Sequence, residues 1–317
     1  MLIIDLNNND PWFNLAAEEY FFSNTDEDVF LVYVNSHCLI TGKHQNPAEE
    51  VNPRCLRKYN IPLIRRISGG GTVYHDEGNL NYAYIKSIPD GKKVNFSEYT
   101  GEIIAFLKKH GVDARRGEKN EIRAGKLKIS GNAEHVFKNR VLHHGTLLFS
   151  ADLELMSECL KKGTALIKSR AVQSNPSETG NLKGLLPGIR DVQELKTDLL
   201  DHIAGSSTPA VGHALRGSET ASINKLKEEK YRTWEWNYAY GPDYTFTNNF
   251  HIMDEPAYIN MEVSAGVISS CEFSGPPQWS AVESLLPGTR HNYEDISRML
   301  KKNSLSADDD LIFNFLM

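Results

Sequence analysis

Apolar and polar positions near the start of the chain follow the spacing of a helix. Asp10 before Pro11 has the form of an N-cap followed by proline at the first helical position. Apolar residues then recur at helical spacing, at Phe13, Ala16, Ala17 and Tyr20. We therefore expect a first helix near residues 11–23.

The middle of the chain reads as strands with helices between them. Apolar runs and alternating patterns predict strands at 29–34, 38–40, 80–84 and in a cluster over 120–149. Helical spacing and stop signals predict helices near 96–110, 191–204 and 219–231. Residues 161–188 have little apolar periodicity and read as a long loop. This order indicates an α+β fold with a mixed or antiparallel sheet covered by helices, rather than a parallel doubly wound sheet.

The last part of the chain has a pattern of its own. After Gly241 and Pro242, an aromatic segment gives way to Thr247, Asn248 and Asn249. Strands are predicted at 257–263 and 267–273, and helical segments near 278–286, 292–302 and 307–316. We expect a main domain at 1–246 and a small C-terminal α+β accessory domain at 247–317.

Composition narrows the class of protein. The 317 residues are 40% hydrophobic and 24% charged, which is typical of a soluble globular protein. No apolar run approaches the roughly 20 residues that span a bilayer, and the N-terminus lacks the basic region of a secretory signal, so we expect a cytoplasmic protein. The net charge of −6 provides no general attraction to nucleic acid or to anionic membranes.

The cysteines do not follow a metal-binding or disulfide pattern. They stand far apart, at Cys38, Cys55, Cys159 and Cys271, without Cys-x-x-Cys spacing. We expect reduced thiols in or near the core.

A glycine-rich block, Arg65-Arg66-Ile67-Ser68-Gly69-Gly70-Gly71-Thr72-Val73-Tyr74-His75-Asp76, predicts an anion pocket. Successive glycines let backbone N–H groups approach a ligand, and the two arginines are natural partners of phosphate or carboxylate. The block has neither the Gly-Lys-Ser/Thr of a P-loop nor the spaced glycines of a dinucleotide site, and 72–74 reads as a strand. A glycine-rich hairpin with an incidental arginine pair is the alternative.

A second pair of segments makes the pattern specific. These are Lys126-Leu127-Lys128-Ile129-Ser130-Gly131-Asn132-Ala133 and Leu142-His143-His144-Gly145-Thr146-Leu147-Leu148. Together with the glycine block, in this order, they resemble the lipoate-protein ligase A family. Weaker similarity at 41–47, 168–172 and 234–237 extends the resemblance over about residues 1–245.

The resemblance implies a fold of the biotin/lipoyl ligase type, with 1–246 as the catalytic domain. It also implies a two-step reaction, in which lipoate and ATP, used with Mg²⁺, give lipoyl-AMP and pyrophosphate before a lysine of an acceptor protein takes the lipoyl group. The acceptors implied are lipoyl domains of 2-oxoacid dehydrogenase acyltransferase subunits and the glycine-cleavage H protein. We expect a monomer with no nucleic-acid or membrane partner.

The resemblance assigns Lys128 as the catalytic cation. A carboxylate must approach the α-phosphorus of a polyanion, so a positive charge is needed between them. Lys126, two residues earlier, is expected to face solvent. The residues that the resemblance places against substrate or adenylate are Arg66, Ser68, Gly69, Gly70, Gly71, Val73, His75, Asn79, Asn120, Glu121, Ser130, Gly131, Ala133 and His144.

Several roles stay open at this level. Asn79 either bonds phosphate or holds Lys128, and His75 either contacts ligand or anchors its loop. Glu121 stands where many relatives have aspartate, which leaves a role with magnesium open. Arg65 points away from Arg66 in an extended chain and is expected to be structural, and adjacent His143 and His144 face opposite ways and cannot readily share one ion. The lipoyl tail needs an apolar slot, for which the candidates are Val73, Tyr33, Tyr74, Ala133 and Leu147.

Two rival functions remain. A cysteine-dependent octanoyl or lipoyl transferase needs a thiol near the pocket, and Cys159, in a probable helix over 155–160, is the only one nearby in sequence. A ligase-like scaffold without catalysis is the other rival. A biotin ligase is disfavoured because its glycine-arginine-rich loop is absent.

Overall fold

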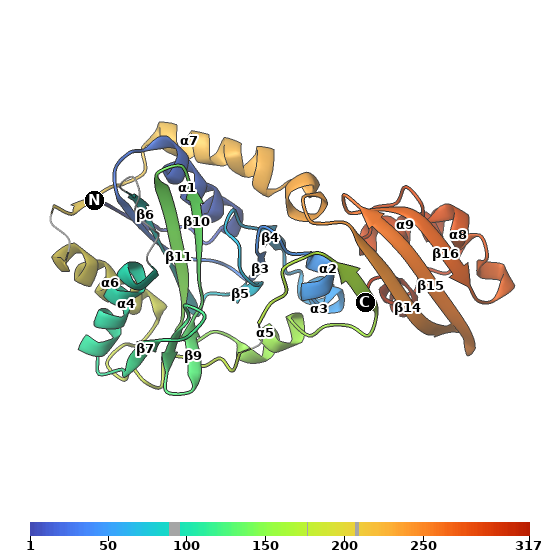
Figure 1. The fold of residues 1–317 in the computed structure, drawn as a ribbon, viewed down its shortest axis with the longest axis horizontal. Helices are drawn as coiled ribbons and strands as arrows, with labels where there is room; N and C mark the ends of the chain where they lie inside the picture. The colour runs from blue at the N-terminus through green and yellow to red at the C-terminus, as the bar shows by residue number, and fades with distance from the viewer. Residues whose placement is uncertain (89–95, 176, 207–208) are drawn as a thin grey trace.

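A six-stranded sheet forms the centre of the larger part of the molecule. The computed structural model describes residues 1–88, 96–175, 177–206 and 209–317 (Figure 1). The strand order is β10-β11-β6-β2-β1-β13, with β1 parallel to β2 and β13 and the other neighbours antiparallel. These strands are β1 (Leu2–Leu6), β2 (Val29–Val34), β6 (Asn79–Ser87), β10 (Asn132–Phe137), β11 (Arg140–Leu148) and β13 (Val211–Gly212). The expected mixed sheet of an α+β fold is confirmed.

Both faces of this sheet are covered, and its central strand β2 is apolar throughout rather than alternating. In β2, Phe30, Val32 and Val34 pack into a core with α4 (Phe96–Lys109) and α6 (Val192–Ser206). Val29 and Leu31 point the other way and pack against α1 (Pro11–Asn24).

The helices begin where the sequence indicates. Asp10 caps α1 by accepting from the backbone N–H groups of Trp12 and Phe13. The helix predicted near 219–231 is α7 (Gly217–Leu226), which continues as a π-helix, η1 (Lys227–Tyr231), and is followed by a second one, η2 (Glu235–Ala239). Among the described residues, no helix combines the length and the apolar character needed to cross a membrane.

Two small sheets flank the large one and carry much of the glycine block and the Lys128 segment. The first has the order β4-β3-β5, with β3 (Cys38–Thr41), β4 (Leu63–Arg65) and β5 (Val73–His75). The second has the order β7-β8-β9, with β7 (Ala114–Arg116), β8 (Ile122–Ala124) and β9 (Leu127–Ser130). The short helices near the first sheet are α2 (Pro47–Glu50), α3 (Pro53–Tyr59) and α5 (Leu153–Cys159).

The C-terminal residues form a separate sheet with its own core, drawn in orange to red in Figure 1. Its order is β12-β14-β15-β16, with β12 (Leu166–Ser169), β14 (Tyr244–Ile252), β15 (Glu255–Ser264) and β16 (Val267–Ser274). Its helices are η3 (Pro277–Trp279), α8 (Val282–Leu285), α9 (Tyr293–Lys302) and α10 (Asp309–Asn314). The boundary expected at 246 falls inside β14.

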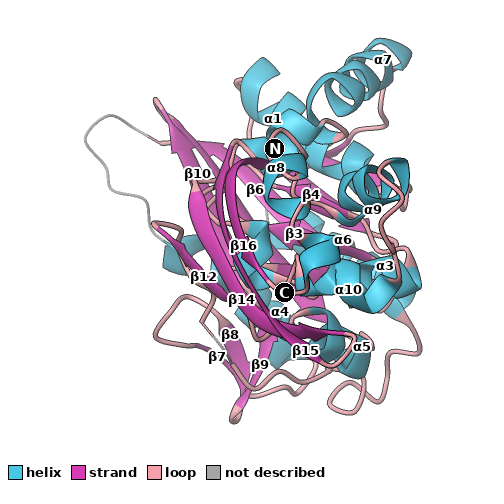
Figure 2. Ribbon diagram, turned by 90° about the vertical axis from the view of Figure 1, so that its right-hand side faces the viewer, coloured by secondary structure: helices cyan, strands magenta, loops and turns pink. Residues whose placement is uncertain are grey.

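The reading of 161–188 as a loop throughout was wrong, because β12 lies within it and pairs with β14 (Figure 2). β12 is an edge strand of four residues, with Leu166 and Lys168 exposed. So short and half-exposed a segment has too little apolar alternation to be recognised before its partner is known.

The expectation of four reduced thiols was also wrong. Cys55 of α3 and Cys159 of α5 form a disulfide, with their Cα atoms 5.1 Å apart. The two lie 104 residues apart in sequence, so only the packing of α3 against α5 brings them together. Cys38 and Cys271 are free and buried.

Candidate active site

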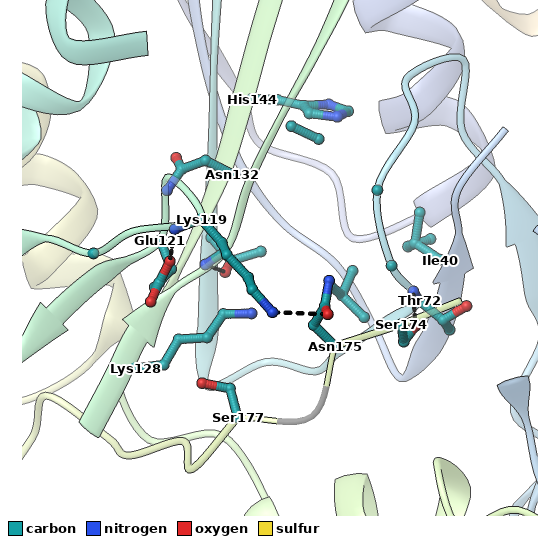
Figure 3. Close-up of a pocket in the computed structure, with 18 of the residues that line it drawn as sticks. Ile40, Thr72, Lys119, Glu121, Lys128, Asn132, His144, Ser174, Asn175 and Ser177 are labelled. Carbon is teal, nitrogen blue, oxygen red and sulfur yellow. Dashed lines mark hydrogen bonds between the residues drawn. The ribbon is translucent and has the colours of Figure 1, made fainter. Parts of the chain in front are cut away.

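A cavity of about 700 Å³ opens beside the large sheet, a size suited to a small-molecule ligand. Its walls come from the glycine block, the β7–β8 hairpin, the segment 131–133, the middle of β11, and Ser174, Asn175 and Ser177 (Figure 3). Segments far apart in the sequence therefore meet at one site.

The glycine loop adopts a conformation that requires glycine. Gly70 has φ of +89°, which residues with a Cβ rarely adopt. A Cβ on Gly42 would collide with the carbonyl oxygen of Gly70, so two loops approach each other closely here. Gly70 and Gly71 line the cavity, whereas Gly69 does not.

Arg66 holds this loop from inside. Its guanidinium donates to the carbonyl oxygens of Ile40, Gly69 and Gly71, at 2.6 to 3.0 Å, and to Ser68 Oγ at 3.0 Å. Burial lowers the pKa of Arg66 to about 10. Four of its five N–H groups are committed to the loop, so most of its hydrogen-bonding capacity shapes the pocket and little is left for a phosphate.

Arg65 points to the other side, as its place in an extended segment predicts. The side chain is fully buried and donates to the backbone carbonyls of Gly42, Lys43, Gln45, Trp236 and Asn237. Arg65 therefore connects the β3–α2 loop to η2.

Lys128 reaches into the cavity from β9 (Figure 3). Among the described residues, no hydrogen-bond acceptor or carboxylate pairs with its Nζ. Burial lowers the pKa of Lys128, and the charge of Glu121 opposes this shift. Its backbone is fixed, because its N–H donates to Glu178 O and its carbonyl accepts from Gly180 N. Lys126 is exposed and lies outside the cavity lining.

The hairpin of β7 and β8 brings several cations to the same cavity. Arg115, Arg116, Lys119 and Arg123 line it, and Lys119 Nζ donates to Asn175 Oδ1 at 2.8 Å, across the opening in Figure 3. These arginines and Lys119 were not among the predicted pocket residues. The sequence of a hairpin rich in basic residues does not by itself indicate which cavity those residues face.

Glu121 belongs to the same wall but is already engaged. Its Oε1 accepts from Arg123 at 3.1 Å, and its Oε2 accepts from the backbone N–H of Lys119 at 3.0 Å. Burial alone would raise the pKa of Glu121, but these hydrogen bonds outweigh it and hold the pKa below its usual value.

His144 links the cavity to a buried polar group behind it. Its Nε2 lies 2.6 Å from Ser68 Oγ, and its Nδ1 lies 2.8 Å from Glu18 Oε2. Tyr33 donates to the other oxygen of Glu18 at 2.7 Å. Ser68 is 1% exposed and does not line the cavity, so this serine–histidine–glutamate arrangement presents no nucleophile to a ligand.

His75 and Asn79 have different environments. His75 lines the cavity, and its Nδ1 accepts from Asn35 Nδ2 at 3.0 Å. The proton therefore sits on Nε2, which is buried and has no partner among the described residues. Burial, with the charge of Arg66, lowers the pKa of His75 to about 3, which keeps the ring a neutral donor. Asn79 is buried outside the lining and donates to Asn81 Oδ1.

Many of the predicted site residues meet at this cavity. Those that line it are Arg66, Gly70, Gly71, Val73, His75, Glu121, Lys128, Gly131, Ala133 and His144. Those that lie behind or beside it are Ser68, Gly69, Asn79, Asn120 and Ser130. The first group is placed to touch a ligand, and the second to support the wall.

Part of the cavity wall is apolar. Tyr33, Val73 and Ala133, three of the candidates for an apolar slot, line the cavity, as do Leu15 and Ile40. Tyr74 and Leu147, also considered for this slot, pack in hydrophobic cores instead.

The described residues hold no cluster of three or more His, Cys, Asp or Glu side chains with metal-binding geometry. No cysteine lines the cavity. Cys159 is joined to Cys55, and Cys38 is buried in the core beside α1.

Three comparisons identify proteins similar to this chain. The sequence model of the lipoyl protein ligase A/B catalytic domain matches residues 10–204. Lipoate–protein ligase 1 of Staphylococcus aureus is 37% identical over 307 residues, which cover 94% of this chain and 93% of that protein. Lipoate-protein ligase LplJ of Bacillus subtilis is 34% identical over 312 residues, covering 95% and 94%. A crystal structure of lipoate-protein ligase A bound with ATP superimposes with a TM-score of 0.63 and 26% identity, over 74% of this chain and 96% of that one.

Proposed function

The chain belongs to the lipoyl protein ligase A/B family, and from this membership we propose that it is an ATP-dependent lipoate-protein ligase. In the first step a carboxylate oxygen of lipoate attacks the α-phosphorus of ATP, and the bond to pyrophosphate breaks. In the second, a lysine amine of an acceptor protein attacks the acyl carbon, AMP leaves and an amide forms. The mixed anhydride is needed because a free carboxylate is a poor acyl donor.

Lys128 is the observation that carries this proposal. Its ammonium group stands in the cavity without an acceptor among the described residues. The glycine loop and the basic β7–β8 hairpin line the same cavity. A cation there offsets the repulsion between carboxylate and triphosphate and stabilises the charge that develops on the phosphate oxygens. The pKa lowering comes from burial, and a bound polyanion would oppose it.

The rest of the cavity suits the two substrates. The apolar part of the cavity wall, which includes Leu15, Ile40 and Val73, offers a slot for the hydrocarbon chain of lipoate. Arg115, Arg116 and Lys119 stand near Lys128, where the pyrophosphate portion of ATP would bind. The Nε2–H of His75 is a neutral donor available to a ligand oxygen.

Magnesium fits this site only as part of the substrate. Both oxygens of Glu121 are engaged with Arg123 and the Lys119 backbone, and Glu118 is the one other carboxylate that lines the cavity in the described part of the chain. These residues do not make a resident metal site. Mg²⁺ would arrive bound to ATP, keeping phosphate and water ligands.

The acceptors that we propose are lipoyl domains of 2-oxoacid dehydrogenase acyltransferase subunits and the glycine-cleavage H protein, with the ligase acting as a monomer. The cysteine-dependent transferase is disfavoured because none of the four cysteines lines the cavity and Cys159 is held in a disulfide. A silent scaffold is disfavoured because it has no need of an ammonium group that stands in the cavity without a partner among the described residues.

The test is lipoate-dependent release of pyrophosphate from ATP. The wild-type protein should release it, whereas Lys128→Ala should slow release by about 100- to 1,000-fold, since the lost charge acts on the transition state. Lys126→Ala is the matched control, because that lysine is exposed outside the cavity, and it should keep near-normal rates. Near-normal release by a folded Lys128→Ala protein would exclude the assignment. No release by the wild type would favour a transferase or a scaffold.

A further inference from the structure

A chain of buried polar side chains runs from β10 to the wall of the cavity. Glu134 Oε1 lies 2.9 Å from His143 Nδ1, and His143 Nε2 lies 3.2 Å from Asn132 Oδ1. Asn132 Nδ2 then donates to the backbone carbonyl of Asn120 at 3.0 Å. The side chain of Glu134 is only 7% exposed and that of His143 is fully buried. None of these contacts is needed to close the β10–β11 hairpin, so they call for a separate explanation.

The last hydrogen bond of this series holds the loop between β7 and β8. Asn120 has φ of +66°, the left-handed conformation in which asparagine is enriched. It follows Gly117, Glu118 and Lys119, which line the cavity on the side of the basic residues. The hydrogen bond from Asn132 therefore ties this loop to the large sheet.

The hydrogen bonds fix where the protons are. Asn132 Nδ2 faces two acceptors, Asn120 O and Ser130 Oγ, and its Oδ1 accepts from the hydroxyl of Tyr82 at 2.5 Å. The amide is therefore oriented with Oδ1 towards His143, which must donate from Nε2. In a neutral imidazole Nδ1 then has no hydrogen, and its contact with Glu134 requires a protonated carboxyl.

The surroundings favour this arrangement. Burial raises the pKa of Glu134 to about 7. Burial, with the charge of His144, lowers the pKa of His143 to about 3. Two aromatic rings stack on His143 from neighbouring elements: Tyr99 of α4, with its centroid at 4.9 Å, and Tyr82 of β6. Beyond Tyr99, Lys86 is paired with Glu98. Among the described residues, no lysine or arginine forms an ion pair with Glu134.

We propose that Glu134 and His143 are positioning residues that share one proton and, through Asn132, hold the 117–121 loop in place for ATP. When that proton is lost, the neutral imidazole turns its remaining N–H towards the Glu134 carboxylate. A lone pair on Nε2 then faces Asn132 Oδ1, and the two repel. If the Asn132 amide rotates to relieve this, its oxygen faces Asn120 O instead. Rotation removes the hydrogen bond to Asn120 O, and repulsion without rotation weakens it, so the loop is held less tightly in either case.

The consequence for catalysis rests on the proposed function. In pyrophosphate release, the KM for MgATP of the wild type should rise about three- to tenfold between pH 6 and pH 8.5, the effect of losing one buried hydrogen bond. Glu134→Gln places an amide donor against His143 Nδ1 at every pH, so its KM should stay at the pH 6 value. The titration of ATP itself affects the KM of both proteins equally. The difference between their KM values at each pH therefore reports on Glu134.

His135→Gln is the matched control. His135 is the neighbour of Glu134 on β10 but faces the other side of the sheet, with its ring 5.2 Å from that of Phe22. This variant should keep the wild-type dependence of KM on pH. Equal pH slopes for Glu134→Gln and the wild type would overturn the proposal, as would a flat wild-type profile.

Two measurements without substrate separate this proposal from the ligase assignment. The pKa of Glu134 is raised in the folded state, so the protonated carboxyl stabilises the fold. This stabilisation is complete below about pH 4.5, the ordinary pKa of the carboxyl, and is lost as the pH rises through about 7. The free energy of unfolding should fall over this window in the wild type and stay flatter in Glu134→Gln. At pH 8, backbone amides of 117–121 should be more protected from hydrogen exchange in Glu134→Gln than in the wild type, with equal protection at pH 6. Equal protection at pH 8 would refute loop release even if the protein released no pyrophosphate.

Discussion

Replacement of Arg65 by methionine should destabilise the fold by several kcal/mol, although the residue lies outside the hydrophobic cores. Arg65 is fully buried and has no carboxylate partner among the described residues. Its N–H groups instead satisfy carbonyl oxygens of the β3–α2 loop and of η2, at 2.8 to 3.0 Å. Methionine fills a similar volume but donates no hydrogen bond.

The magnitude follows from the acceptors left behind. Five carbonyl oxygens, those of Gly42, Lys43, Gln45, Trp236 and Asn237, lose a donor. At about 1 kcal/mol for each lost bond, the upper end is about 5 kcal/mol. Two effects make the loss of stability smaller than this. First, the substitution removes the cost of burying the guanidinium, a cost that also lowers the pKa of Arg65 to about 10. Second, water can reach the outer carbonyls. We expect a loss of about 3 to 5 kcal/mol in the free energy of unfolding.

The assay is urea unfolding of Arg65→Met and Arg65→Lys beside the wild type. Lysine carries the charge but cannot reach all five acceptors, so its loss should be intermediate, and it remains measurable if the methionine variant does not fold. Arg190→Met is the control, since that side chain is 83% exposed and its one ion-pair partner among the described residues is Glu194, so its unfolding midpoint should not change. A loss below about 1 kcal/mol for Arg65→Met would refute the reasoning.

The remaining predictions concern the thiols and the loops. Cys159→Ser should retain lipoate-dependent pyrophosphate release, because ATP activation needs no thioester; loss of acyl transfer in a folded variant would restore the transferase reading. Residues 65–76 and the loop within 161–188 should gain protection from hydrogen exchange when a non-hydrolysable lipoyl-adenylate analogue binds, since charged partners arrive with the ligand. Equal protection with and without the analogue would show a preformed pocket.

The sequence predicts best those features that depend on local chemistry. Asp10 and Pro11 define the start of α1 because capping acts within one helical turn. The alternation over 80–84 predicts a strand within β6 (Asn79–Ser87), and the opposite directions of Arg65 and Arg66 follow from strand geometry. The resemblance in the glycine and Lys128 blocks likewise predicts that they share a site, although Arg66 and Lys128 lie 62 positions apart in the chain.

What the sequence leaves out is how side chains are engaged after folding. Arg66 carries the charge expected of a phosphate ligand, yet its N–H groups are used by its own loop. Ser68 stands in the motif but lies behind the wall, next to His144. Nothing in the spacing of Lys119 and Asn175 shows that they meet across the cavity, because that contact depends on tertiary packing.

The segment after α5 makes the C-terminal sheet part of the active-site architecture. β12 pairs with β14, so Leu166–Ser169 belongs to that sheet. Five residues later, Ser174 Oγ accepts from the N–H of Thr72 in the glycine block. Five residues span at most about 17 Å when fully extended, so the connection has little slack. The same segment then pairs with Lys128 at Thr179. A displacement of β12 with the C-terminal sheet must therefore act on Ser174, and through it on the glycine block.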